Sequence, residues 1–390
     1  MTIRLSGITW DHPRGHAPLA ASIARYRAVR PDIEINWAVR SLRDFGELPL
    51  EGLAEKFDMI VFDHPFVGQA EAHGLLADLT PYIGPAHRVW LDEGALGATW
   101  NSYLWKGGIY GLPIDAAAQV AAWRPDLLAK VGRHPPATFQ QLLRLAKDLR
   151  QHGLWVALTG CPTDIICHVL TLAANMGHPP PCPNGLVLTP EVGRTILRML
   201  QDLVAVSHPA SLSLNPIQVF DRMTSADEIA YVPYAFGYTN YARSDVPRRL
   251  CFGDIVAAGQ QGSAGALLGG AGFGVTTRCQ HPAEAAAYGL HLCHPEYQRT
   301  HYFDDGGQPG MLQAWTDPRC DAETHGFFSG TLRTLTSSYL RPRMPGFVHF
   351  FEEVGKQLNA YLRAPGDPDA MIKRLNDDFQ DMAASAGGIR

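Results

Sequence analysis

The first sixty residues alternate between apolar and polar positions in a way that predicts a β-α-β-α-β order. Apolar residues alternate with polar or small ones over the first ten positions and again over residues 33–37, which is typical of β-strands. The segments 17–29 and 48–57 show helical periodicity. The unbroken apolar run at 58–62 suits a parallel strand that is buried on both faces. This order predicts a parallel sheet with right-handed crossovers.

Beyond residue 108 the pattern predicts a second unit of strands and helices. A strand-like stretch begins at Gly108 and resumes at residues 120–123, so we expect the chain to cross into the new unit here. Thr138 and Thr189 stand at positions suited to helix N-caps. The helices predicted here span residues 127–131, 139–151, 164–176, 190–206, 282–293, 348–362 and 368–384. The strands span residues 155–158, 228–233 and 267–275.

Length and charge exclude several classes of protein. A chain of 390 residues exceeds one ordinary hydrophobic core and predicts two domains. Charged residues make up 18% of the chain and the formal net charge is −5, which predicts no nucleic-acid partner. No apolar run reaches the ~18 residues that a membrane span requires. The first residues lack an apolar signal core, so we expect a cytoplasmic protein as the sequence stands, or a periplasmic one if a signal has been removed.

Cysteine and glycine patterns argue against several kinds of chemistry. The seven cysteines are odd in number, scattered and without a CxxC pair, so we expect no disulfide framework. The glycine-rich stretch 267–275 precedes a strand and opens no helix, so it does not match a dinucleotide-binding fingerprint. The sequence contains no GxSxG, P-loop, HExxH or EF-hand motif. We therefore expect no cofactor.

Candidate chemistry is densest in residues 9–16, Thr-Trp-Asp-His-Pro-Arg-Gly-His, at the predicted end of the first strand. These residues carry an indole, a carboxylate, two imidazoles and a guanidinium, whereas a plain turn needs only proline and glycine. In open α/β sheets, ligands bind at the carboxyl ends of the strands. A second polar and aromatic loop, residues 63–66, ends another predicted parallel strand. We expect both loops to lie at the same sheet edge and to form a site.

Two side chains of the first loop have a binding role and a structural alternative. Trp10 offers a large ring that stacks on a ligand, or it fills a domain boundary. Arg14 presents a fork that matches a ligand carboxylate or phosphate, or it pairs at the surface with Asp11 or Asp44. We predict that Arg14 anchors an anionic group of the ligand.

Both loops also contain a histidine. His12 and His64 can act as a neutral donor–acceptor pair, as an acid/base pair or as metal ligands. No third ligand has a favourable spacing, so we expect no metal. We expect both imidazoles to line the same subsite as Arg14. If either titrates near its unperturbed pKa, affinity should change between about pH 5.5 and 7.5.

Further candidates lie later in the chain. Asp115 accepts ligand hydrogen bonds at the crossover, or it caps a turn. Cys161 precedes a helix whose N-terminus would lower the thiol pKa, which allows a nucleophile, while an inert filler is the plainer alternative. The aromatic residues Tyr234, Phe236 and Tyr238 form a ligand wall in the second unit, or they pack in its core.

Two candidates come from glycine-rich segments. Gly270 allows close approach of the backbone to the ligand or to the hinge. Gln308 lies in the turn-rich loop 306–310, which closes over the ligand or remains a solvated turn. We include both residues among the ligand-binding candidates.

Four groups of motifs together resemble a known family. They are Gly-Leu-Pro-Ile-Asp at 111–115 with Ala-Trp-Arg-Pro-Asp-Leu-Leu at 122–128, Thr-Phe-Gln-Gln-Leu-Leu at 138–143 with Ala-Lys-Asp-Leu at 146–149, Gly-Gly-Ala-Gly-Phe-Gly-Val at 269–275, and Arg-Pro-Arg-Met-Pro at 341–345. Their order and spacing resemble the extracellular solute-binding proteins of ABC importers, specifically the carbohydrate-type group that includes maltose-binding proteins. Each motif is weak alone, but the resemblance spans nearly the whole chain.

The resemblance implies an α/β, two-lobe, periplasmic-binding-protein-like (type II) fold with hinge crossovers and a ligand cleft between the lobes. We place the first lobe at residues 1–112 plus about 270–312, and the second at 113–269 plus about 313–390. The resemblance also implies that the lobes close on the ligand and trap it. The sequence departs from the family in lacking a signal peptide and in the many ionisable groups of residues 9–16.

Two functions follow from these observations. The first is a monomeric solute-binding protein that traps a ring-containing polar or anionic small molecule, with an ABC permease as its partner if it is exported. The alternative is a cytoplasmic enzyme on the same scaffold, acting on a small organic acid or a sugar-like substrate. In that case His12, His64 and Asp11 would perform the acid/base chemistry. The sequence leaves the choice open.

Overall fold

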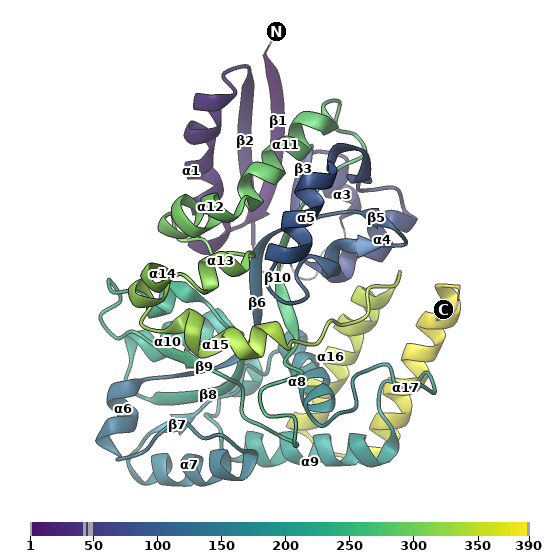
Figure 1. Ribbon diagram of the computed structural model, residues 1–390. Coiled ribbons are helices and arrows are strands. Elements are labelled where there is room, and N and C mark those ends of the chain that lie inside the picture. Colours follow the sequence, from purple (N-terminus) through teal and green to yellow (C-terminus); the bar gives the residue numbers. More distant parts are fainter. Residues whose placement is uncertain (1, 42–43, 46–49, 388–390) are drawn as a thin grey trace. The chain divides into compact units, whose positions relative to one another are not determined.

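The computed structural model describes residues 2–41, 44–45 and 50–387, and Figure 1 shows the course of the chain. The chain divides into two compact units. Unit 1 comprises Met1–Ala117, Gly269–Asp321 and Arg343–Val348. Unit 2 comprises Ala118–Leu268, Ala322–Pro342 and His349–Arg390. Each unit is therefore assembled from three separate stretches of chain.

The sheet of unit 1 confirms the predicted order of the opening elements. Strands β1 (Ile3–Trp10), β2 (Ile33–Arg40) and β3 (Met59–Phe62) are parallel, in the order β2-β1-β3. Strand β10 (Leu268–Val275) runs antiparallel beside β3, and it is followed by the first residues of β6 (Leu112–Trp123). All of β3 is buried, as expected for an apolar run that is covered on both faces.

Helix α1 (Pro13–Val29) begins four residues before the start that its apolar periodicity predicted. His12 is the N-cap, and its side chain accepts a hydrogen bond from the backbone N–H of Arg14. Pro13 occupies the first turn, where its missing N–H costs nothing. An imidazole replaces the usual Ser, Thr or Asp cap, so the polar loop of the sequence is itself the start of a helix.

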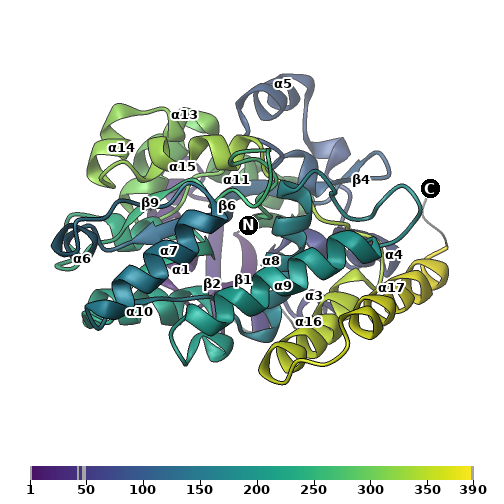
Figure 2. The ribbon, with the colours of Figure 1, turned by 90° about the horizontal axis from the view of Figure 1, so that it is seen from below.

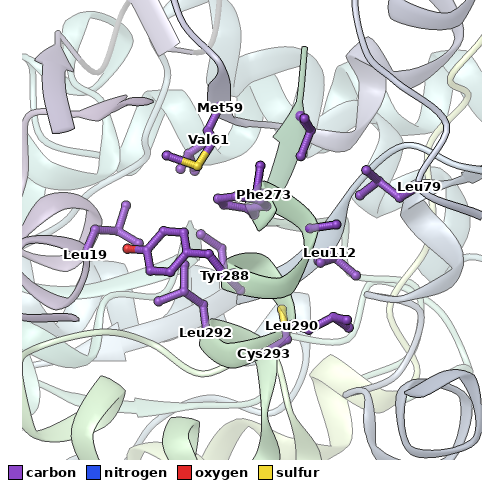
Figure 3. Packing of buried hydrophobic residues seen from close by; sticks show 14 of the residues in the cluster. Leu19, Met59, Val61, Leu79, Leu112, Phe273, Tyr288, Leu290, Leu292 and Cys293 are labelled. Atoms are coloured by element: carbon purple, nitrogen blue, oxygen red, sulfur yellow. The ribbon is translucent and has the colours of Figure 1, made fainter. Parts of the chain in front are cut away.

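The core of unit 1 contains side chains from segments that are far apart in the sequence (Figure 3). Leu19 of α1, Phe273 of β10 and Tyr288 of α11 (Pro282–Cys293) belong to one buried cluster. Tyr288 is fully buried with its hydroxyl satisfied, because this group pairs with Ser22 Oγ at 2.6 Å and accepts a hydrogen bond from Trp37 Nε1 at 3.1 Å. The first stretch of unit 1 thus depends on β10 and α11, which belong to its second stretch, for a packed core.

The remaining elements of unit 1 are short. They are α3 (Glu51–Ala54), α4 (Val67–Ala72), α5 (Pro85–Gly94), β4 (Leu104–Trp105), β5 (Gly108–Ile109), α12 (Pro295–Tyr297), a π-helical turn (Gln298–Tyr302), α13 (Leu312–Trp315) and the start of α14 (Pro318–Glu323). The helix predicted over 48–57 corresponds to α3 and is shorter than predicted, while residues 48–49 lie outside the described residues.

Unit 2 contains a mixed sheet. The second part of β6 pairs antiparallel with β8 (Ile229–Phe236) and with β9 (Cys251–Gly253). The short strand β7 (Trp155–Val156) runs parallel to β8. The strands predicted at 155–158 and 228–233 therefore exist, although β7 is shorter and β8 longer than the pattern indicated.

The helices of unit 2 follow the sequence pattern closely except for α10 (Pro216–Ser225) and α15 (Phe327–Thr336), which the sequence pattern did not predict. The others are α6 (Pro125–Lys130), α7 (Phe139–Gln151), α8 (Pro162–Asn175), α9 (Pro190–Val206), most of α16 (Phe347–Arg363), and α17 (Pro368–Ser385). Thr138 and Thr189 cap α7 and α9 as predicted. Helices α9 and α17 pack side by side (Figure 2). Within the described residues, none of the helices is long and apolar enough to cross a bilayer.

Gly270 explains part of the glycine-rich signal in β10. Its φ angle is +108°, and a Cβ atom there would lie 2.5 Å from the carbonyl oxygen of Asp115 on β6. Only glycine tolerates both conditions. The close backbone approach that we expected at Gly270 is therefore an approach to its neighbouring strand.

Candidate functional site

The carboxyl ends of β1 and β3 in unit 1 carry His12, Asp63 and His64. His12 is half-buried at the N-terminus of α1, and its Nδ1 accepts the backbone N–H of Arg14 at 3.1 Å. Burial, assisted by the charge of Arg14 and by His16, lowers the pKa of His12 to about 4. The ring is therefore neutral at pH 7, with its hydrogen on Nε2, which makes it a fixed hydrogen-bond donor.

Arg14 and Asp115 form a buried, two-pronged ion pair. Arg14 Nε donates to Asp115 Oδ2 at 2.8 Å and Arg14 Nη2 donates to Oδ1 at 2.6 Å. The two residues are only 3% and 2% exposed. Burial raises the pKa of the Asp115 carboxyl, and the adjacent guanidinium opposes that rise. The fork that we expected to bind a ligand anion thus has a carboxylate of its own unit in place.

His64 is buried beside the carboxylate of Asp63. Its Nδ1 lies 3.0 Å from Asp63 Oδ1, and the backbone N–H of His64 donates to the same oxygen at 2.8 Å. The imidazole meets the ring of Tyr103 edge-on at 6.4 Å between centroids. The carboxylate beside Nδ1 orients the ring and favours the tautomer with its hydrogen on Nδ1. In that tautomer Nε2 is the nitrogen that can accept a proton, which is the arrangement of an oriented general base.

Trp10 is buried in the core of unit 1. It is 3% exposed and belongs to the main hydrophobic cluster. Its ring packs against Phe45 at 4.9 Å, and a Cβ atom on Gly15 would lie 2.4 Å from the indole. A stacking role on a ligand would therefore require this ring to be uncovered.

The loop 306–310 is fastened to β6. Gln308 Nε2 donates to the carbonyl oxygen of Ala116 at 2.7 Å, and the Ala116 N–H donates to the Gln308 carbonyl at 3.3 Å. Gln298, which no sequence pattern singled out, donates to Ile114 O and accepts the N–H of Gly310 at 2.7 Å. These bonds use the Gln308 amide within unit 1 and hold the loop in place.

Cys161 in unit 2 is not an activated thiol. Its Sγ donates to Asp164 Oδ2 at 2.9 Å across the first turn of α8. Burial and the charge of Asp164 raise the thiol pKa far above its usual value. The expectation that the helix N-terminus would lower this pKa is wrong, because these two effects outweigh the helix dipole.

The three aromatic candidates of unit 2 have different environments. Tyr234 is fully buried, and its hydroxyl donates to Val256 O at 2.8 Å. Tyr238 is 7% exposed and meets the ring of Phe220 at 6.4 Å between centroids. Phe236, at the end of β8, retains partial exposure. Of the three, Phe236 offers the largest share of its surface to a ligand, and Tyr234 offers none.

A buried polar network beside these rings was missed by sequence reasoning. Thr171 Oγ1 donates to Gln119 Oε1 at 2.6 Å, and Gln119 Nε2 donates to His168 Nδ1 at 3.1 Å. His168 Nε2 then donates to Thr159 O at 2.6 Å. Burial lowers the pKa of His168 to about 4, so every member of the network is neutral. Lone polar residues in apolar runs were its only trace in the sequence.

The described residues contain no cluster of three or more His, Cys, Asp or Glu side chains arranged to hold a metal ion. The donor atoms of His12, His64 and Asp63 serve hydrogen bonds and ion pairs instead.

Comparison with known proteins supports the resemblance seen in the sequence. Residues 10–153 match the family model described as bacterial extracellular solute-binding protein. Maltose-bound MalE3 of T. maritima is 18% identical, with 98% of this chain and 100% of that chain covered and a TM-score of 0.83.

Two further structures agree. A ribitol complex of an ABC transporter solute-binding protein from Agrobacterium radiobacter K84 is 19% identical, covers 97% of this chain and 98% of its own, and has a TM-score of 0.80. The substrate-binding protein Lmo0181 of Listeria monocytogenes, in complex with cycloalternan, is 17% identical, covers both chains fully, and has a TM-score of 0.82. These matches confirm the predicted periplasmic-binding-protein-like α/β fold.

Proposed function

Because the chain shares its fold, and over residues 10–153 its family signature, with bacterial extracellular solute-binding proteins, we propose that it is the solute-binding component of an ABC importer. The observation that carries this proposal is the match over 98–100% of this chain and 100% of the related chains. The related structures hold maltose, ribitol and cycloalternan. We propose a small polyhydroxylated molecule as the solute.

The polar groups of unit 1 support a hydroxyl-rich ligand. A sugar hydroxyl both donates and accepts, so it pairs best with a fixed donor next to a fixed acceptor. The neutral His12 is a donor at Nε2, and the carboxylate of Asp63 is an acceptor.

This function implies partners and a location. We propose that a membrane permease with its ATPase receives the solute, and that the protein acts outside the cytoplasmic membrane. The closure on the ligand that the resemblance implies stays a prediction. Small-angle scattering with saturating solute should show a smaller radius of gyration, and an unchanged radius would contradict closure.

Calorimetry tests the proposed function directly. Maltose, ribitol, mannitol and tagatose are titrated into the protein, and at least one should bind. His12→Ala should weaken that binding by roughly 3- to 10-fold, the share of one hydrogen bond. His73→Ala is the control, because His73 is an exposed histidine of unit 1 paired with Glu51. If none of these solutes binds, the proposed solute class is wrong.

One observation favours the enzyme alternative, namely the oriented His64–Asp63 pair at 3.0 Å. An acid/base enzyme should consume the solute that it binds. Nuclear magnetic resonance of the same solutes, incubated with the protein for hours, would show new signals, and His64→Ala should abolish them. Unchanged spectra in the presence of bound solute would contradict catalysis on that solute.

A further inference from the structure

Arg40 ends strand β2 at the carboxyl edge of the unit 1 sheet. It is the register partner of Trp10, the last residue of β1. Residues paired in this way on neighbouring strands project to the same side of a sheet. The Arg40 side chain is 8% exposed, so it is one of the few buried guanidinium groups of the molecule. This edge is where open α/β sheets bind their ligands.

The hydrogen bonds that Arg40 donates go to uncharged groups, and the Asp44 carboxylate acts on its charge without a direct ion pair. Its Nη1 donates to Asp44 O at 3.3 Å and its Nη2 donates to Val61 O at 3.1 Å. Its Nε is buried without a hydrogen bond, and the guanidinium carbon lies 5.3 Å from the centre of the Phe45 ring. Within residues 2–41, 44–45 and 50–387, no carboxylate forms an ion pair with it.

Trp10 brings a second unused donor to the same place. Its indole Nε1 is also buried without a hydrogen-bond partner among the described residues. The indole packs on Phe45 at 4.9 Å, so Phe45 contacts both Trp10 and Arg40. Two N–H donors and one positive charge that lacks a direct ion pair among the described residues are thus gathered around a single aromatic ring.

A buried cation without a counter-charge is costly, and proteins usually supply an anion for it. Burial lowers the pKa of Arg40 to about 10, and the charge of Asp44 offsets this lowering only in part. Arg14 gives the contrast in the same unit, because a carboxylate engages its fork fully. The anion that would complete Arg40 is missing from the described chain.

We propose that Arg40 and the Trp10 indole form an anion subsite for the carboxylate or phosphate of the bound solute. The proposal rests on the proposed function and narrows it: the solute is a sugar acid or a sugar phosphate. Both anions carry several acceptor oxygens, so one group can accept Arg40 Nε–H and Trp10 Nε1–H together. Arg14, which the sequence suggested for this role, is then a positioning residue for β6.

Matched pairs of probes that differ in charge test the subsite. Gluconate with glucitol, galacturonate with galactose, and glucose 6-phosphate with glucose are titrated by calorimetry into wild type and variants. In the wild type, the charged member of at least one pair should bind 10- to 100-fold more tightly than its neutral partner. The preferred pair distinguishes a carboxylate from a phosphate.

The variants assign that preference to Arg40. Arg40→Gln should reduce the ratio of the two affinities to about one, and Arg40→Lys should retain part of it, because a point charge lacks the fork. Arg4→Gln is the matched control: it removes an exposed arginine paired with Glu34 at the opposite end of the same two strands. That variant changes net charge equally and should leave the ratio intact.

The outcomes separate this inference from the proposed function. Equal binding of charged and neutral members, or a charge preference that survives Arg40→Gln, overturns the subsite and leaves sugar binding standing. Binding of no probe overturns both. If Arg40→Gln does not fold by circular dichroism, Trp10→Phe removes the indole N–H while keeping an aromatic ring. It should weaken binding of the charged member alone by roughly 3- to 10-fold, and an unchanged ratio would overturn the subsite.

Discussion

Asp115 and Gln119 stand four residues apart on β6, and each is a buried polar side chain in a different unit. Asp115 belongs to unit 1 and forms an ion pair with Arg14. Gln119 belongs to unit 2 and forms a chain of neutral hydrogen bonds through His168 and Thr171. Both are almost completely shielded from water. One strand therefore has two buried polar side chains that are satisfied in different ways, one by an ion pair and the other by neutral hydrogen bonds.

The ion pair and the neutral network differ in how much stability is lost when one of their residues is removed. An ion pair concentrates its attraction between two groups, and removing one leaves an uncompensated buried charge. In the neutral network each group has more than one partner, and removing one leaves a dipole without a bond, which costs less. We therefore expect the unit 1 end of β6 to be the more fragile under substitution, and the unit 2 end to lose stability in acid through His168.

The largest effect should follow loss of the charged pair. Arg14→Ala leaves Asp115 buried without its cation and should lower the free energy of unfolding by about 3–5 kcal/mol. Urea unfolding monitored by circular dichroism measures the change. Arg4→Ala removes an exposed ion pair instead and should cost about 1 kcal/mol or less. Equal costs for the two variants would remove the contrast.

Acid should act on the neutral network through His168. The pKa of His168 is about 4 in the folded state and about 6.5 when unfolded, so the unfolded chain binds the proton first. The contribution of His168 is complete above pH 6.5 and is lost as the pH falls toward 4, by up to ~1.4 kcal/mol per pH unit. His168→Gln should flatten this part of the stability profile by up to about 3 kcal/mol. His12 has the same shift and remains in the variant, so the difference isolates His168. A profile identical to wild type would show that His168 does not titrate this way.

Removing a neutral member should cost less than removing Arg14. Gln119→Leu keeps the volume of the side chain but leaves His168 Nδ1 and Thr171 Oγ1 without their partner. We expect a loss of about 1–3 kcal/mol in the same urea experiment. A cost as high as that of Arg14→Ala would mean that the network, like the ion pair, behaves as one unit.

The smallest effect concerns His12, beside the charged pair. Because its pKa is about 4, it should stay neutral between pH 5.5 and 7.5 and contribute no pH dependence to solute binding there. The ratio of dissociation constants at these two pH values should therefore agree within about twofold between wild type and His12→Gln. A pH dependence present in the wild type and absent from the variant would contradict the lowered pKa.

Local sequence determined the local structure well. Residues 139–151 and 190–206 are helices with the predicted bounds, since their apolar stripes and threonine caps act within a few residues. The start of α1 was misplaced because its cap is a histidine, a residue that sequence rules do not expect at that position. The thiol pKa of Cys161 was misjudged because Asp164, three residues later, accepts the thiol hydrogen and adds a negative charge beside it.

The candidate site depended on pairings that leave no local signal. Arg14 lies 101 residues from Asp115, and Gln119 lies 49 residues from His168. The sequence predicted that Arg14 binds an anionic group, and Arg14 does bind one. Only the fold shows that this group is the carboxylate of Asp115 in the same chain. Arg40 attracted no attention in the sequence, because an arginine at the end of a strand is ordinary until its burial and lack of a carboxylate are known.

The position of β10 in the unit 1 sheet has a consequence for synthesis on the ribosome. Strand β3 ends at Phe62, and its neighbour β10 begins at Leu268, about 200 residues later. The ribosome adds roughly 5–20 residues per second, so the edge of β3 stays unpaired for about ten to forty seconds before β10 has been synthesised. During that time an apolar strand edge is open to pairing with other nascent chains. We therefore expect a chaperone to bind the emerging N-terminal segment. We also expect the full chain to refold slowly at high concentration.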